Sequence, residues 1–103
     1  MAIATLLNGV TSTGAGSAAS PVVGAHRTYQ ATVAGTGAVT ATVVVEVSLN
    51  GTNFITLGTI TLSGTTSASD GFTSEAQWDY VRGNVTAISG TSAAVTLTMG
   101  TSS

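Results

Sequence analysis

Apolar and polar residues alternate along much of the 103-residue chain, most regularly from Val39 to Leu49. In that stretch every odd-numbered residue is apolar, and every even-numbered residue is polar except Val44. A period of two puts successive side chains on opposite faces of a strand, so one face is predicted to be buried and the other solvated. Asn50-Gly51-Thr52-Asn53 tolerates positive φ, and a second strand is predicted from Phe54. The chain is therefore predicted to be organised around a long hairpin, Val39 to Leu62.

The alternation changes phase in the second arm of this hairpin. Ile55 and Leu57 are apolar at odd positions, whereas Ile60 and Leu62 are apolar at even positions. A one-residue β-bulge shifts the faces of a strand in this way, and glycine inside a strand often marks one. The sequence therefore predicts a bulge near Gly58.

Shorter stretches of the same kind occupy the rest of the chain, and none has helical periodicity. Strands are predicted at residues 3–7, 22–23, 27–33, 72–74 and 78–88, with a last strand carrying Val95, Leu97 and Met99, and turns at 34–37, 63–69 and 89–92. About eight short strands at this spacing are typical of a sandwich. We expect one all-β domain over residues 1–103, an antiparallel, jelly-roll-like β-sandwich. Residues 11–20, TSTGAGSAAS, are predicted to form a flexible loop.

Composition narrows the possible partners. Charged residues make up 6% of the chain, against roughly a quarter in ordinary domains. A net charge of -2, with Arg27 and Arg82 as the only arginines or lysines, argues against nucleic acid. A nearly uncharged surface has weak colloidal protection and is easiest to understand if it packs against other proteins. The chain has no cysteine, so disulfides and thiolate metal sites are excluded.

The sequence predicts no membrane association. No apolar run approaches the roughly 18 residues of a membrane span. Asn8-Gly9 interrupts the apolar run of Ile3 to Leu7, and no basic residues precede it, so we expect no secretory leader.

Residues able to do chemistry are few. General acid–base catalysis needs a tuned pair of groups, but the single histidine, His26, has Arg27 as its only notable neighbour in sequence. We therefore expect no catalytic residue and no transition-metal site. Asp70, Glu75 and Asp79 are close enough in sequence to suggest calcium, but their spacing matches no known calcium loop, so no metal or cofactor is expected. The G-x-G-x-x-A string at 14–19 precedes Pro21 rather than a helix, so a dinucleotide site is not expected either.

Two groups of residues resemble binding surfaces, one for sugar and one for ice, and each also has an ordinary structural explanation. Trp78 and Tyr80 could stack against a sugar, but a tryptophan in a chain with 5% aromatic residues is more often a core or interface anchor. The pairs Thr40/Thr42, Thr59/Thr61 and Thr96/Thr98 resemble the arrays of ice-binding sheets, although threonine is also the ordinary polar residue of solvated strands.

Two stretches carry a family resemblance. Residues 45–57, VEVSLNGTNFITL, resemble the V-S-x-D/N-G-x-N-W/F-x-x-L hairpin of small β-sandwich proteins encoded among tailed-bacteriophage structural genes. Residues 78–85, WDYVRGNV, resemble the W-x-Y-V-R-x-N-V strand of the same proteins. Phe54 stands where tryptophan is common in that pattern, and Gly83 where a larger apolar residue is common.

The resemblance implies a virion protein assembled in the bacterial host cytoplasm, most simply a head decoration (cement) protein. Such a protein packs on the major capsid protein as a homo-oligomer, and the family pattern transfers no catalytic residue. The interface candidates are Thr40, Thr42 and Val44 on the outer side of the hairpin, with Trp78 and Tyr80. The alternative is a neck, tail or fibre accessory module that binds carbohydrate through Trp78 and Tyr80.

Overall fold

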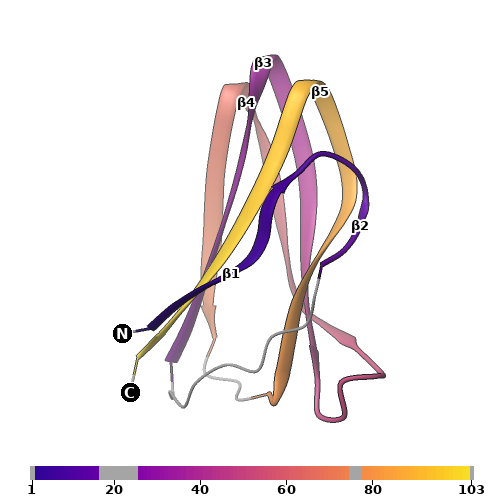
Figure 1. Cartoon of the computed structure of the whole chain (residues 1–103). Helices are drawn as coiled ribbons and strands as arrows, with labels where there is room; N and C mark the ends of the chain where they lie inside the picture. Colours follow the sequence, from indigo (N-terminus) through magenta and orange to yellow (C-terminus); the bar gives the residue numbers. More distant parts are fainter. Residues whose placement is uncertain (1, 17–25, 75–77, 103) are drawn as a thin grey trace.

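The computed structural model describes residues 2–16, 26–74 and 78–102, and every regular element in them is a strand. These residues form one antiparallel sheet of five strands in the order β1-β5-β3-β4, with β2 also paired to β5 (Figure 1). The strands are β1 (Ala2–Val10), β2 (Gly14–Ala15), β3 (His26–Ser48), β4 (Ile55–Ser74) and β5 (Tyr80–Ser102). The predicted all-β, antiparallel class is confirmed.

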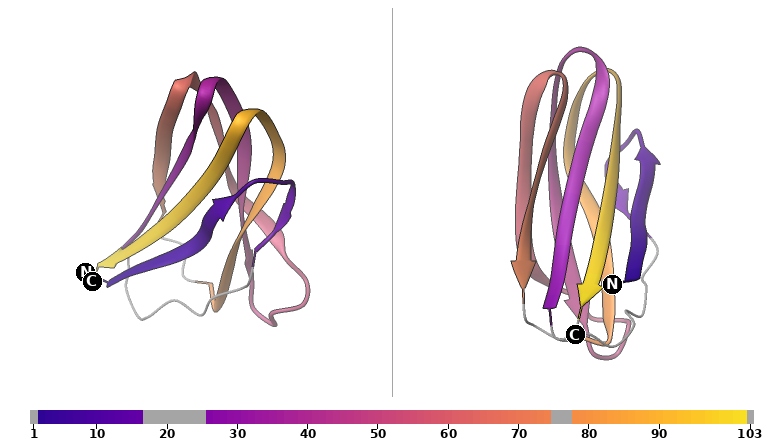
Figure 2. Two further views of the ribbon diagram at one scale, coloured as in Figure 1. Left: turned by 45° about the horizontal axis from the view of Figure 1, so that its top comes forward. Right: turned by 90° about the vertical axis from the view of Figure 1, so that its left-hand side faces the viewer.

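The sheet is folded over itself. β3, β4 and β5 each run to the apex, bend there and return, so that the two halves of each strand face each other (Figures 1 and 2). Glycines let these halves approach closely. A Cβ added at Gly58 would lie 2.6 Å from Phe72 Cζ in the other half of β4, and one at Gly83 would lie 2.6 Å from Leu97 Cδ2 in the other half of β5.

We call the two facing halves the Thr28 layer and the Thr40 layer. The Thr28 layer contains residues 26–34 of β3, 68–74 of β4 and 93–102 of β5, together with β1. The Thr40 layer contains residues 38–48 of β3, 55–64 of β4 and 80–89 of β5, together with β2.

Backbone conformation makes the bends at the apex. Positive φ angles occur there at Gly37 (76°), Thr66 (70°), Gly90 (123°) and Ser92 (57°). The pairing of β3 with both neighbours also shifts register beyond Ala34, where regular pairing breaks off before the bend. Glycine and short polar residues tolerate these angles best, so the Gly/Ser/Thr-rich segments of the sequence become the apex.

The core lies between the layers and follows the alternation in the sequence. Each long strand sends alternate side chains inward, and burying one Val, Leu or Met side chain contributes about 1.5–3 kcal/mol. The predicted inward positions of three segments are confirmed, because all are at most 1% exposed: Tyr29, Ala31 and Val33; Val43, Val45 and Val47; Val95, Leu97 and Met99.

The predicted hairpin and its bulge are both present. β3 pairs with β4 so that Val45 lies opposite Gly58 while Glu46 lies opposite Thr56, which leaves Leu57 as the extra residue. Ser48 Oγ accepts hydrogen bonds from the backbone N–H groups of Asn50 and Gly51, at 3.2 and 3.0 Å, and donates one to Asn50 Oδ1. These bonds hold the turn that joins the two strands.

The structure differs from the prediction mainly in where strands end. Instead of about eight short strands, the described residues form five, because the turns predicted at 34–37, 63–69 and 89–92 are bends inside continuous strands. β1 also continues through Asn8-Gly9 to Val10. Of the predicted loop at 11–20, residues 14–15 form β2 and Gly16 N–H donates to Gly83 O at 2.8 Å. Residues 17–20 and the strand predicted at 22–23 lie outside the described residues.

Two side chains at the end of β3 also differ from the prediction. Ser48, expected on the solvated face, is 1% exposed, because it bonds to the turn. Leu49, expected on the buried face, is 64% exposed, because β3 ends at Ser48.

Candidate interaction surface

The candidate surface is the outer side of the Thr40 layer, which we call the Thr40 face. It contains the predicted residues Thr40, Thr42 and Val44, which lie in a row along the central strand β3. Thr40 is exposed, whereas Thr42 and Val44 are half-buried. Register places hydroxyl, amide and methyl side chains on either side of them: Ser63, Thr61 and Thr59 on β4, and Ser89, Ala87 and Asn84 on β5.

Charged residues border this face at the end nearest the β3–β4 turn. Arg82 Nε donates to Glu46 Oε1 at 2.7 Å, and Asn84 Nδ2 donates to Glu46 Oε2 at 3.3 Å. The Arg82 guanidinium carbon also lies 4.0 Å from the centre of the Phe54 ring. Arg82 and Glu46 therefore neutralise each other and hold the β3–β4 turn against β5, and the rest of the Thr40 face carries no charge.

Hydroxyl groups distinguish the Thr40 face from the outer side of the Thr28 layer. In the Thr28 layer they bond to each other across strands, with 2.8 Å between Thr32 Oγ1 and Ser69 Oγ and 3.3 Å between Thr28 Oγ1 and Thr73 Oγ1. In the Thr40 layer the hydroxyls of Thr40, Thr42, Thr59, Thr61, Ser63 and Ser89 make no hydrogen bond within the described residues. Apart from Asn84, which donates to Glu46, and Thr86, whose Oγ1 donates to Thr42 O at 3.4 Å, the Thr40 face therefore keeps its side-chain donors and acceptors available to a partner.

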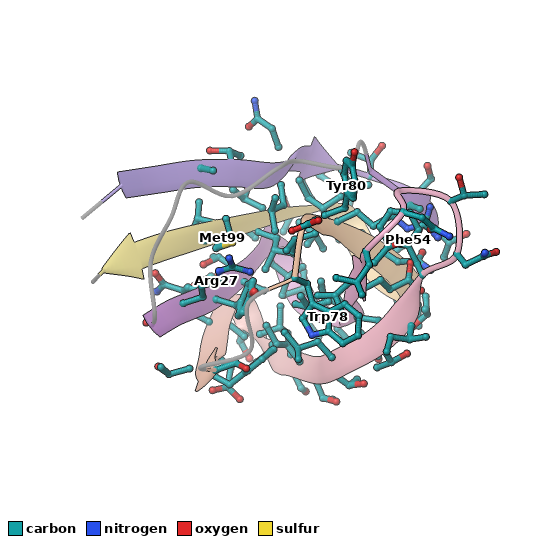
Figure 3. All side chains as sticks on the ribbon, turned by 90° about the horizontal axis from the view of Figure 1, so that it is seen from below. Arg27, Phe54, Trp78, Tyr80 and Met99 are labelled. Atoms are coloured by element: carbon teal, nitrogen blue, oxygen red, sulfur yellow. The ribbon has the colours of Figure 1, made fainter. Side chains whose placement is uncertain are left out.

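The other two predicted residues, Trp78 and Tyr80, lie apart at the open end opposite the apex (Figure 3). Trp78 is half-buried and packs against the core, and its backbone O accepts a 2.9 Å hydrogen bond from Arg27 Nη1. Tyr80 lies beside the β3–β4 turn, where a Cβ added at Gly51 would be 3.3 Å from its ring. The structure brings together the three β3 candidates but does not join these two rings into one platform.

Sequence reasoning missed a buried polar pair at the open end. Arg27 is 5% exposed and Tyr29 is fully buried, with the Tyr29 ring centre 5.0 Å from that of Phe72. Arg27 Nε and the Tyr29 hydroxyl have no hydrogen-bond partner within the described residues. Burial raises the pKa of Tyr29, although the nearby Arg27 opposes this. The sequence could have predicted the burial of Arg27, because it falls on the same side of the alternation as Tyr29, Ala31 and Val33.

The described residues offer no group of three or more His, Asp or Glu side chains able to hold a metal ion. Asp70 Oδ1 accepts a 2.8 Å hydrogen bond from Gly71 N–H, and Asp79 is exposed. Glu75 lies outside the described residues. Among those residues there is also no helix with the length and apolar character of a membrane span.

Comparisons with known proteins add no relative. The chain matches no protein-family model, and neither a curated protein nor a solved structure is significantly similar to it.

Proposed function

We propose that this chain is a non-enzymatic structural protein of a tailed-phage virion, a capsid decoration protein that packs on the shell as an oligomer. In this proposal the folded sheet acts as a two-layered, jelly-roll-like sandwich. The major capsid protein is the partner, and the Thr40 face is the surface that docks.

The composition of the surface supports a docking role. The two outer faces consist mainly of Thr, Ser, Ala and Gly, in a chain with 6% charged residues. Charged residues are depleted at the centre of protein interfaces, because their desolvation is costly. A surface that is poor in charge throughout therefore suits a subunit whose neighbours cover much of it.

The observation that carries the proposal is the difference in hydrogen bonding between the two outer faces. Between β3 and β4, hydroxyls of the Thr28 layer bond to each other, whereas the facing hydroxyls of Thr42 and Thr61 do not. Between β3 and β5 the two layers are alike, because Thr86 Oγ1 donates to Thr42 O and Thr98 Oγ1 donates to Gln30 O, both at 3.4 Å. Val44 adds a half-buried apolar group on the central strand β3, at the end of this hydroxyl-rich patch nearest Glu46. A partner can satisfy the free hydroxyls and cover the valine without separating an ion pair.

The test is binding to empty shells assembled from the major capsid protein of the same phage. We expect wild-type protein to bind and Val44→Asp to lose most of that binding, because the new carboxylate would be desolvated in the contact. The matched control is Ala94→Asp, which also replaces a half-buried apolar residue but lies in the Thr28 layer. Unchanged binding of Val44→Asp, or equal losses for both variants, would exclude the Thr40 face. A wild-type protein without affinity for shells would exclude the decoration role.

The alternative is a neck, tail or fibre module that binds carbohydrate through Trp78 and Tyr80. Sugar stacking needs the faces of aromatic rings, but Trp78 packs on the core and Tyr80 against the turn glycine Gly51. Binding to a glycan array that is lost in Trp78→Ala, with no binding to shells, would favour this alternative over decoration.

A further inference from the structure

One long side of the molecule is the free edge of β4. β4 is the last strand in the order β1-β5-β3-β4 and pairs only with β3 among the described strands, in both layers (Figure 2). The outer edge of such a strand carries a row of unpaired backbone N–H and C=O groups. These groups are a template for another strand.

Proteins usually protect a free edge with bulges, bends, charges or prolines. β4 has three such features. The bulge at Leu57 and the positive φ of Thr66 interrupt its regular backbone. Asp70 is its single charged residue; it pairs with Ala31 and is exposed.

The segment between the bulge and the bend, Gly58–Gly64, has none of these features. Its sequence GTITLSG contains no charge and no proline. Ile60 and Leu62 point into the core, at 3% and 2% exposed, while Thr59, Thr61 and Ser63 are exposed on the Thr40 face. The segment is thus a regular, uncharged strand edge with one apolar and one hydroxyl side.

We propose that this segment pairs with the same segment of a second copy of the chain, antiparallel and centred on Thr61. Thr61 is the midpoint of Gly58–Gly64, so this register uses the whole unprotected edge. It places Ile60 opposite Leu62 of the second copy, and Thr59 opposite Ser63 of the second copy. Apolar and hydroxyl sides therefore match, as stable cross-strand pairs require.

The charges on β4 agree with a second copy as the occupant. The paired segment, Gly58–Gly64, carries no charge, so the strand pair brings no like charges together; Asp70, the single charged residue of β4, lies outside this segment in the Thr28 layer. The pairing joins the Thr40 layers of two copies into one sheet, and their Thr40 faces become continuous. This contact between two copies would form in the free protein, in addition to the proposed contact with the shell. It can therefore be tested without a shell.

The first test is sedimentation equilibrium over a range of protein concentrations. A single strand pair is a small interface, so we expect a weak, concentration-dependent dimer of the wild type. Thr61→Lys should raise the dimer dissociation constant about tenfold or more, because two lysines would face each other at the edge. The matched control is Thr42→Lys, which places the same charge directly beside Thr61 but on the central strand β3. It should leave dimerisation unchanged.

The second test measures the register of the proposed strand pair by cross-linking introduced cysteines. The chain has no native cysteine, so only the introduced thiols can react. A mixture of Ser63→Cys and Thr59→Cys proteins should give covalent dimers with a thiol cross-linker shorter than about 10 Å, because those residues face each other. Ser63→Cys alone should give few, because its two copies are offset by about 13 Å along the strand. The proposal would be overturned by a wild type that stays monomeric, by equal weakening in Thr42→Lys and Thr61→Lys, or by equal cross-linking of the mixture and of Ser63→Cys alone.

Discussion

The two ends of the folded sheet are closed in different ways. At the apex, the backbone itself bends, through positive φ angles at Gly37, Thr66, Gly90 and Ser92. At the open end, side chains fill the space between the layers. Trp78 packs there against the core, and its backbone O accepts a hydrogen bond from the buried Arg27.

This difference predicts how each end responds to substitution. A residue at the apex is restricted by its backbone angle and by the backbone atoms around it, so size and branching matter more than polarity. A residue at the open end is restricted by the volume it fills, so truncation should matter more than the loss of a polar atom.

The largest effect is expected at Gly90. Its φ is 123°, and a Cβ there would lie 2.7 Å from Ala38 O and 2.9 Å from Val39 Cγ1. Gly90→Val should therefore lower the free energy of unfolding by about 3–4 kcal/mol, since backbone strain and overpacking add. Urea denaturation followed by circular dichroism measures this loss.

Gly37→Val separates the cost of backbone strain from the cost of overpacking. Gly37 also has positive φ, 76°, but a Cβ there would meet no atom within 4 Å. Strain alone should cost about 1–2 kcal/mol. Equal losses at Gly37 and Gly90 would show that steric crowding does not contribute to the closure of the apex.

A smaller effect is expected for Trp78→Ala at the open end. Trp78 is half-buried against the core, so its truncation should cost about 2 kcal/mol, less than the 3–5 kcal/mol of a fully buried aromatic residue. Tyr80→Ala is the control and should cost less than about 1 kcal/mol, because Tyr80 lies beside the turn and is not among the residues packed against the core. Similar losses for the two variants, in the same urea assay, would contradict side-chain closure of this end by Trp78.

Sequence alone predicted most of the core and the hairpin. The alternation identified Tyr29, Val45 and Leu97 as buried, and the change of phase after Leu57 identified the bulge. It did not predict the bends. A tight turn and a bend inside a strand both need residues that tolerate positive φ, so Gly/Ser/Thr clusters mark both equally.

The candidate surface was predicted only in part. A period of two suffices to put Thr40, Thr42 and Val44 on one outer face. Hydroxyl pairing across strands, such as that of Thr32 with Ser69, depends on the register between distant segments, which local pattern does not specify. For the same reason the free edge of β4 could not be recognised before the strand order was known.

The smallest effect at neutral pH is expected for Tyr29→Phe, at the open end of the sheet. The Tyr29 hydroxyl is buried without a hydrogen-bond partner among the described residues, so its removal should change stability by less than about 0.5 kcal/mol. At alkaline pH the two proteins should separate. Burial raises the pKa of Tyr29 in the folded state above the ordinary tyrosine value of 10.0. From about pH 10 upward the unfolded chain therefore loses this proton first, and the stability of the wild type falls.

Tyr29→Phe lacks the phenolic proton, so its stability should decline less over the same alkaline range. Urea midpoints at neutral pH and above pH 10 measure both effects. A loss of more than about 1 kcal/mol at neutral pH would mean that the hydroxyl makes a stabilising bond. An identical alkaline decline in both proteins would mean that Tyr29 is not the group responsible. The expected pattern would show that the buried hydroxyl does not stabilise the open end at neutral pH, while both proteins keep the ring, whose centre lies 5.0 Å from that of Phe72.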